Sequence, residues 1–160
     1  MMIRYIAFVL ATASAGVPGA HAQNSAQARI DAIVRSVNGG DIGVVEMSGL
    51  PSDAAFRVNI TPERLESWWA YKLTVRGLSL EPEKLRMPLS SAAIQPSSAK
   101  LASLDVRTAI VFYAKTPEGK RIASFYFDRS GRHGAVNNMP VAFPSGLLPL
   151  LKKAVHASID

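Results

Sequence analysis

The chain has 160 residues, with 18 Lys and Arg against 12 Asp and Glu, a net charge of +6, and no cysteine. Disulfides, thiolate zinc sites and cysteine nucleophiles are therefore excluded. The positive charge is spread along the chain, which is typical of a solvated basic surface without a dedicated partner.

Residues 1–22 have the features of a Sec signal peptide. Arg4 supplies a positive start, and residues 5–15 form a short, mostly apolar run. Ala20 and Ala22 then place small residues at positions −3 and −1 of a cleavage site. This order of features predicts export with cleavage after Ala22.

The mature chain is predicted to be one soluble domain over residues 23–160. The apolar run near the N-terminus is about half of the ~20 residues that a spanning helix needs, and no second such run follows. We therefore expect no stable membrane insertion after cleavage. The cysteine-free composition favours the periplasm of a Gram-negative bacterium, where nucleic acid is not an expected partner.

The first half of the mature chain is predicted to hold two helices and a hairpin. The predicted elements are a helix over residues 27–37, strands over 41–49 and 56–60, and a helix from 62 to about 76. Phe56, Val58 and Ile60 alternate as in a strand with one buried face. Thr61 is the expected N-cap of the second helix, and Pro62 suits its first position.

Trp68 and Trp69 form the largest aromatic feature of the sequence. On the wheel of the predicted helix, Trp69 lies in line with Leu65 and Leu73, which favours packing in the core. The alternative is a platform that binds a glycan or another small ligand, and exposed indole rings would favour it.

Residues 78–106 are predicted to be an irregular segment rich in Pro, Ser and Ala. Its three prolines forbid one long helix, although short helical pieces fit residues 83–86 and 97–102. A segment of this length with little regular structure can also carry function.

The second half of the chain predicts an antiparallel meander and a final helix. The expected strands cover residues 107–115, 121–128 and 132–137, with turns at 116–119 and 128–131. Pro140 and Pro144 indicate a loop, after which Ser145 is the expected cap of a helix over residues 146–157. The predicted fold class is α+β, with a single antiparallel sheet, made of the N-terminal hairpin and the C-terminal three-stranded meander, packed against two to three helices.

No catalytic or cofactor motif is found in the sequence. His133 and His156 have no metal-ligand spacing, and the sequence has no nucleotide-binding loop and no nucleophile elbow. We therefore expect no metal, no cofactor and no enzymatic activity. The alternative is an enzyme with an unrecognised site near Asp128 and His133, which clustering of these two residues with Asn137 around a pocket would favour.

A binding surface remains as the expected functional feature. Arg, Tyr and Trp are enriched where proteins bind proteins. The candidate binding residues are Trp68, Arg107, Tyr113, Arg121, Tyr126, Arg129, Arg132 and His133. The same charges would also protect a sheet against aggregation. The expected function is non-catalytic recognition of another protein in the cell envelope, in the format of inhibitors and immunity-type neutralisers. The sequence does not specify the partner, the ligand or the oligomeric state.

Overall fold

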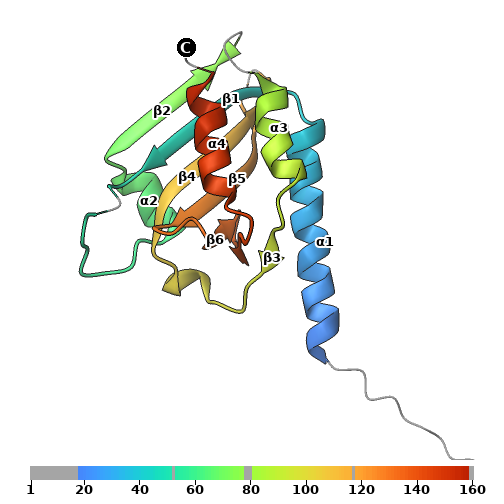
Figure 1. Cartoon of the computed structure of the whole chain (residues 1–160), viewed down its shortest axis with the longest axis vertical. Coiled ribbons are helices and arrows are strands. Elements are labelled where there is room, and N and C mark those ends of the chain that lie inside the picture. Colours follow the sequence, from blue (N-terminus) through green and yellow to red (C-terminus); the bar gives the residue numbers. More distant parts are fainter. Residues whose placement is uncertain (1–17, 52, 78–80, 117, 159–160) are drawn as a thin grey trace, which may run out of the picture.

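The computed structural model describes residues 18–51, 53–77, 81–116 and 118–158 (Figure 1). The elements in chain order are α1 (Pro18–Gly39), β1 (Ile42–Gly49), α2 (Pro62–Trp68), β2 (Tyr71–Arg76), α3 (Pro82–Ser90), β3 (Gln95–Pro96), the 3₁₀ helix η2 (Leu101–Ser103), β4 (Val106–Ala114), β5 (Arg121–Asp128), β6 (His133–Val136), β7 (Met139–Ala142) and α4 (Leu147–His156). The strands form one seven-stranded sheet in the order β2-β1-β4-β5-β6-β7-β3. Every neighbouring pair is antiparallel, so the α+β fold is confirmed.

The predicted meander forms the centre of the sheet, as strands β4, β5 and β6. β-branched and aromatic residues favour strands, and Ile110 of β4 faces Phe125 of β5. In the turn after β5, the Gly131 N–H donates to the carbonyl of Asp128 at 3.1 Å, with Gly131 at a φ of +69° that glycine adopts without strain. The earlier turn is closed by the N–H of Gly119, and its Pro117 lies outside the described residues.

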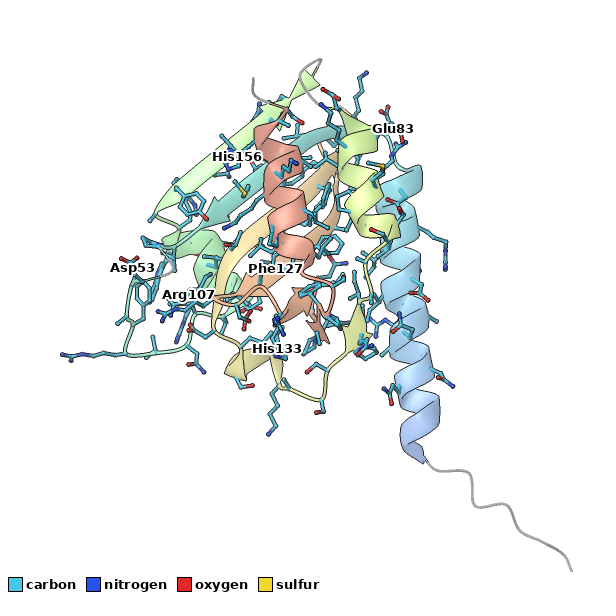
Figure 2. The ribbon with its side chains drawn as sticks, viewed as in Figure 1. Asp53, Glu83, Arg107, Phe127, His133 and His156 are labelled. Atoms are coloured by element: carbon cyan, nitrogen blue, oxygen red, sulfur yellow. The ribbon has the colours of Figure 1, made fainter. Side chains whose placement is uncertain are left out.

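The main hydrophobic core lies between one face of the sheet and helices α1, α3 and α4 (Figure 1). Successive residues of a strand point to opposite faces, so alternate residues of β4 and β5 enter this core. Its largest fully buried side chains include Ile30, Leu85, Leu89, Ile110, Phe112, Phe125, Phe127, Phe143, Leu147 and Leu151. The ring centroid of Phe127, which is labelled in Figure 2, lies 4.5 Å from that of Phe143.

A smaller core lies on the opposite face of the sheet, under α2. Leu65 of α2 is fully buried and belongs to a cluster with Ala109, Tyr126 and Ala135 from β4, β5 and β6. Because α2 has only seven residues, it covers the middle of this face and leaves Lys72, Thr74 and Arg76 of β2 exposed.

The predicted N-terminal hairpin between residues 41–49 and 56–60 is wrong in its second strand. β1 pairs with β2, so that Met47 faces Leu73 and Val45 faces Val75. Residues 56–60 instead form an irregular connection, with Ile60 as its buried apolar residue. Apolar and polar residues alternate in both segments. Residues 71–76 form the strand, because their apolar side chains reach the main core when they pair with β1.

The second helix is also shorter than predicted, because it ends at Trp68 rather than near residue 76. Thr61 caps it as expected, accepting from the N–H of Arg64. Residues 71–76 carry apolar positions that fit a helical wheel when it is continued from Leu65. They also alternate with a period of two, and pairing with β1 selects the strand.

The region predicted to be irregular contains α3, β3 and η2, while residues 78–80 lie outside the described residues. α3 includes the helical piece predicted at 83–86 and extends it, because Pro82 lies in the first turn, where proline is tolerated. The helical piece predicted at 97–102 is wrong, since only η2 forms there.

Two details of the C-terminal region also differ from the prediction. The loop expected around Pro140 contains strand β7, which pairs with β6 and β3. The final helix is confirmed, but its N-cap is Gly146 in the left-handed conformation rather than Ser145. Proline is tolerated at this place because β7 and β3 are short and close to the edge of the sheet.

α1 begins at Pro18, so the predicted cleavage position after Ala22 lies near the start of this helix. The α1 residues that are buried in the main core are Ile30 and Val37. Within the described part of the chain, no helix is both long and apolar enough to cross a membrane. Residues 1–17 of the predicted signal peptide lie outside that part.

Candidate functional site

A connected group of polar side chains lies on the face of the sheet that α2 covers only in part. We call this group the polar sheet face. It consists of Glu46 (β1), Glu66 (α2), Lys72 (β2), Tyr113 (β4), Arg121 and Tyr126 (β5). Strand pairing and the packing of α2 on the sheet place these residues together, although they lie up to 80 positions apart in the sequence.

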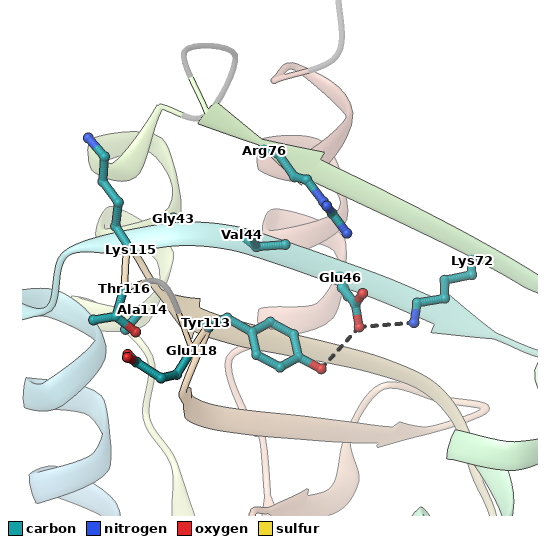
Figure 3. A pocket seen from close by; sticks show the side chains of 11 residues that line it. Gly43, Val44, Glu46, Lys72, Arg76, Tyr113, Ala114, Lys115, Thr116 and Glu118 are labelled. Atoms are coloured by element: carbon teal, nitrogen blue, oxygen red, sulfur yellow. Dashed lines mark hydrogen bonds and ion pairs between the residues drawn. The ribbon is translucent and has the colours of Figure 1, made fainter.

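One half of the polar sheet face is centred on Glu46. Its Oε2 atom lies 3.0 Å from Nζ of Lys72 and accepts a hydrogen bond of 3.0 Å from the hydroxyl of Tyr113 (Figure 3). Burial and the neighbouring Glu46 raise the pKa of Tyr113, against an opposing effect of Arg121. The tyrosine therefore stays protonated and acts as the donor.

The other half is centred on Glu66. Its Oε1 atom accepts from Nη1 of Arg121 at 2.9 Å and from the hydroxyl of Tyr126. Partial burial alone would raise the pKa of Glu66. The two hydrogen bonds and the positive charges of Arg121 and Lys72 together outweigh burial and hold that pKa below its usual value. Burial together with Glu66 raises the pKa of Tyr126.

Arg121 joins the two halves, because its guanidinium lies 6.0 Å from the centroid of the Tyr113 ring. Burial would lower the pKa of Arg121, but the ion pair with Glu66 and the neighbouring Tyr113 and Tyr126 more than compensate and raise it. The polar sheet face thus holds fixed charges and fixed donors at neutral pH. Such an arrangement is suited to recognising a complementary surface, because its side chains are ordered before a partner binds.

An open hollow of about 800 Å³ adjoins this network between β1, β2 and the end of β4 (Figure 3). Glu46, Lys72 and Tyr113 form part of its lining, together with Arg76 and Lys115. Among the described residues, neither Arg76 nor Lys115 has an ion-pair partner. The acidic Glu118 also lines the hollow without an ion-pair partner among the described residues, so the three unpaired side chains together carry a net positive charge.

Aromatic side chains border the polar sheet face where α2 meets β2. We call Trp68 and Trp69 the tryptophan edge; their exposed fractions are 53% and 44%. Lys72 lies 6.0 Å from the ring centroid of Trp69. The prediction that Trp69 packs in the core is wrong, because the helix ends at Trp68 and Trp69 has extended backbone angles, so the helical alignment with Leu65 and Leu73 does not exist.

A second cluster lies in an open cleft of about 600 Å³ beside the connection between β1 and α2. Arg107 is only 5% exposed there (Figure 2). Its Nη1 donates to the carbonyl of Ala54 at 3.1 Å, its Nη2 lies 2.7 Å from Oδ2 of Asp105, and its guanidinium lies 4.8 Å from the Phe56 ring centroid. Arg107 therefore holds the connecting loop in place.

The cleft also contains Asp128, Arg129 and His133. The carboxylate of Asp128 accepts from the backbone N–H groups of Arg132 and His133 at 3.0 and 3.2 Å, and from the hydroxyl of Ser130. Asp128 thus stabilises the turn between β5 and β6.

Asn137 lies away from this cleft and accepts from the N–H of Ser124 at 2.8 Å. The structure therefore does not bring Asp128, His133 and Asn137 together around one pocket. No group of three or more His, Asp or Glu side chains in the described parts of the chain is arranged to hold a metal ion.

The structure divides the eight candidate binding residues among different places. Tyr113, Arg121 and Tyr126 belong to the polar sheet face, and Trp68 to the tryptophan edge. Arg107, Arg129 and His133 line the cleft, with Arg129 donating to the Ala54 carbonyl at 3.2 Å. Arg132 is exposed.

Sequence reasoning missed Glu46, Glu66, Lys72 and Arg76. Lys72 and Arg76 alternate with Leu73 and Val75, and this period of two would have revealed β2 and its polar side. Glu46 is an acidic residue in an otherwise apolar strand, which is a weak signal for a paired charge.

Comparison with known proteins gives no match to a protein-family model, to a curated protein or to a solved structure.

Proposed function

We propose that this chain is a small exported binding protein without catalytic activity, and that it recognises another protein through the polar sheet face and the tryptophan edge. An inhibitor or an immunity-type neutraliser has this format. The observation that carries the proposal is the exposure of Trp68 and Trp69 beside an already ordered network of Arg and Tyr side chains.

These residue types contribute most to protein–protein binding. Trp, Tyr and Arg dominate interface energetics because they bury large areas and form directed contacts. Arg121 is fixed by Glu66, so little rotamer entropy is lost when a partner binds. The absence of the Asp128, His133 and Asn137 cluster among the described residues supports a role in binding rather than catalysis.

The N-terminal sequence supports export to the periplasm. Cleavage after Ala22 would shorten α1 but keep Ile30 and Val37, the residues of this helix that are buried in the main core. The mature domain would therefore keep these two buried contacts of α1 with the main core.

A capture experiment tests the proposal. The full chain, with a C-terminal affinity tag, is exported by its own leader, purified and mixed with envelope extracts. We expect one stoichiometric protein partner, which the double variant Trp68→Ala/Trp69→Ala and the variant Arg121→Gln retain poorly. Met87→Ala is the matched control, because Met87 is 69% exposed but lies on α3, on the other face. Equal retention by all variants, or no partner at all, would contradict the proposal.

A glycan or another small ligand is the second candidate, and the exposed indoles are the specific observation that favours it. Trp68 and Trp69 are the only two tryptophans of the chain, so its tryptophan fluorescence reports on this edge alone. A saturable change on titration with soluble cell-wall fragments, without capture of a protein, would favour the ligand function. An unchanged spectrum would exclude the tested fragments.

A further inference from the structure

The strand β2 is an open edge of the sheet. It is the last strand on its side (Figure 1) and has six residues, whereas β3 on the opposite edge has two. In an antiparallel pair, alternate backbone N–H and C=O groups point away from the partner strand. No other described segment pairs with the outer side of β2, so these groups are available to an added strand.

The two sides of β2 differ in chemistry. Lys72, Thr74 and Arg76 share the side of the polar sheet face, because they are opposite Ser48, Glu46 and Val44 of β1. Tyr71, Leu73 and Val75 share the side of the main core, where Val75 is buried and Leu73 is partly buried. An added strand would meet cations on one side and apolar side chains on the other.

A hollow on the core side could receive the side chains of such a strand. It has a volume of about 300 Å³ and is lined by Met47, Tyr71, Lys72, Leu73, Lys152 and His156. Met47, Tyr71 and Leu73 make part of it apolar, and Lys152 and His156 of α4 add basic groups (His156 is labelled in Figure 2).

The charge of the edge points to an acidic partner. Lys72 is already paired with Glu46, whereas Arg76 has no ion-pair partner in the described structure and faces the larger hollow (Figure 3). Lys115 and the acidic Glu118 line the same hollow, so positive charge is in excess there by one. Opposite charges facing each other across a strand pair are favourable, and like charges are unfavourable.

We propose that β2 binds an extended strand of a partner protein that carries acidic side chains opposite Lys72 and Arg76 and apolar side chains opposite Leu73 and Val75. This inference rests on the proposed function and names the kind of partner. The required pattern is acidic, apolar, polar, apolar, acidic. Because it reads the same in both directions, it fits a parallel or an antiparallel strand. Main-chain hydrogen bonds would supply affinity and the alternate side chains specificity.

A second copy of this chain fits the edge poorly. In the antiparallel two-fold register centred on Thr74, Lys72 of one copy would be opposite Arg76 of the other. The net charge of +6 adds repulsion between copies. The edge therefore disfavours self-pairing and favours an acidic strand.

Peptide binding tests the inference directly. A labelled peptide with the core Glu-Val-Thr-Val-Glu is compared by fluorescence anisotropy with its Lys-Val-Thr-Val-Lys counterpart, using purified protein exported from the full chain. We expect the acidic peptide to bind at least about tenfold more tightly, a difference equivalent to ~1.4 kcal/mol. Two N-methylated forms of the acidic peptide are also compared, one methylated at the odd-numbered nitrogens and one at the even-numbered nitrogens. Only one of these two sets of N–H groups points toward β2, so only one of the two forms should lose binding.

Two variants distinguish peptide binding at the β2 edge from general electrostatic attraction between the peptide and a basic protein. Arg76→Glu should weaken the acidic peptide about tenfold and improve binding of the lysine peptide. Lys100→Glu makes the same charge change at an exposed residue beside η2 and should leave the preference unchanged. Equal effects of the two variants, binding that is insensitive to N-methylation, or a dimer that forms through β2 would overturn the inference.

The same peptides distinguish this inference from the proposed function. If a captured envelope protein depends on Trp68 and Trp69 but is neither displaced by the acidic peptide nor lost in Arg76→Glu, strand addition is wrong and protein recognition stands. If the acidic peptide binds β2 but no protein is captured, the strand site stands and the proposed function fails.

Discussion

Replacing Arg107 with methionine should destabilise the protein and loosen the loop between β1 and α2. Arg107 holds this loop through the Ala54 carbonyl at 3.1 Å and through the Phe56 ring at 4.8 Å, and it pairs with Asp105. Methionine keeps much of the aliphatic length but cannot donate hydrogen bonds.

The magnitude follows from these contacts. A hydrogen bond that involves a charged group contributes about 1.5–3 kcal/mol, and a cation–π contact about 0.5–2 kcal/mol. Two effects offset part of the loss, because the side chain of Asp105 is 41% exposed and can be hydrated, and because the buried Nε of Arg107 has no hydrogen-bond partner among the described residues. We therefore expect the free energy of unfolding to fall by about 2–4 kcal/mol, with a decrease in Tm on the order of 10 °C.

Urea denaturation measures the global loss, and amide hydrogen exchange locates it. Exchange in residues 53–60 should increase more than exchange in β4 and β5. Arg132→Met is the matched control, because Arg132 is exposed and its side chain forms no described hydrogen bond or ion pair; it should change stability by less than about 0.5 kcal/mol. A loss below about 1 kcal/mol for Arg107→Met, with unchanged exchange in residues 53–60, would refute the reasoning.

Three further predictions follow from the described contacts. Gly134→Ala should lower the free energy of unfolding, measured in urea, by at least about 2 kcal/mol, because an ideal Cβ would lie 1.8 Å from a β5 carbonyl oxygen. The control His133→Ala should be nearly neutral, because that side chain is exposed. Equal losses for the two variants would contradict this explanation. The folded-state pKa of Glu66 lies below its usual value, so Glu66 contributes stability that is fully present above the unfolded-state pKa and lost as the pH falls through the folded-state value. Urea melts should therefore show wild type exceeding Glu66→Gln in stability at pH 7, with the difference shrinking below about pH 4.5; a pH-independent difference would argue against the ion pair. Acrylamide should quench the fluorescence of Trp68 and Trp69 in the folded protein almost as well as in urea, given their exposure, and strong protection would contradict the exposed tryptophan edge.

Hydrophobic periodicity, turn residues and caps correctly predicted those segments whose pattern fits only one type of secondary structure. The meander was predictable because its first two strands alternate over eight and nine residues and its turns contain favourable glycines. The start of α2 was predictable because Thr61 and Pro62 act within one turn of the chain. The end of α2 was not, because the pattern from Leu65 to Val75 fits both a helical wheel and a strand.

The candidate site was predictable only in part. Tyr113, Arg121 and Tyr126 could be identified because they lie on the predicted meander and are residue types typical of interfaces. Their acidic partners could not be identified, because Glu46 and Glu66 lie on elements whose pairing partners are distant in the sequence. Arg107 was predicted to bind a partner, yet the structure buries it against Ala54 and Phe56.

The sequence by itself determined the absence of cysteine chemistry, the predicted export signal and the α+β class, because composition and short-range periodicity act without knowledge of distant contacts. Only the tertiary structure decided that β1 pairs with β2 and that the two tryptophans are exposed. It also decided that Glu46 and Glu66 bind the Tyr, Lys and Arg side chains of the polar sheet face. The physical reason is that an amphipathic segment specifies that one side must be buried, but not which other segment buries it. That choice depends on the packing of the whole chain.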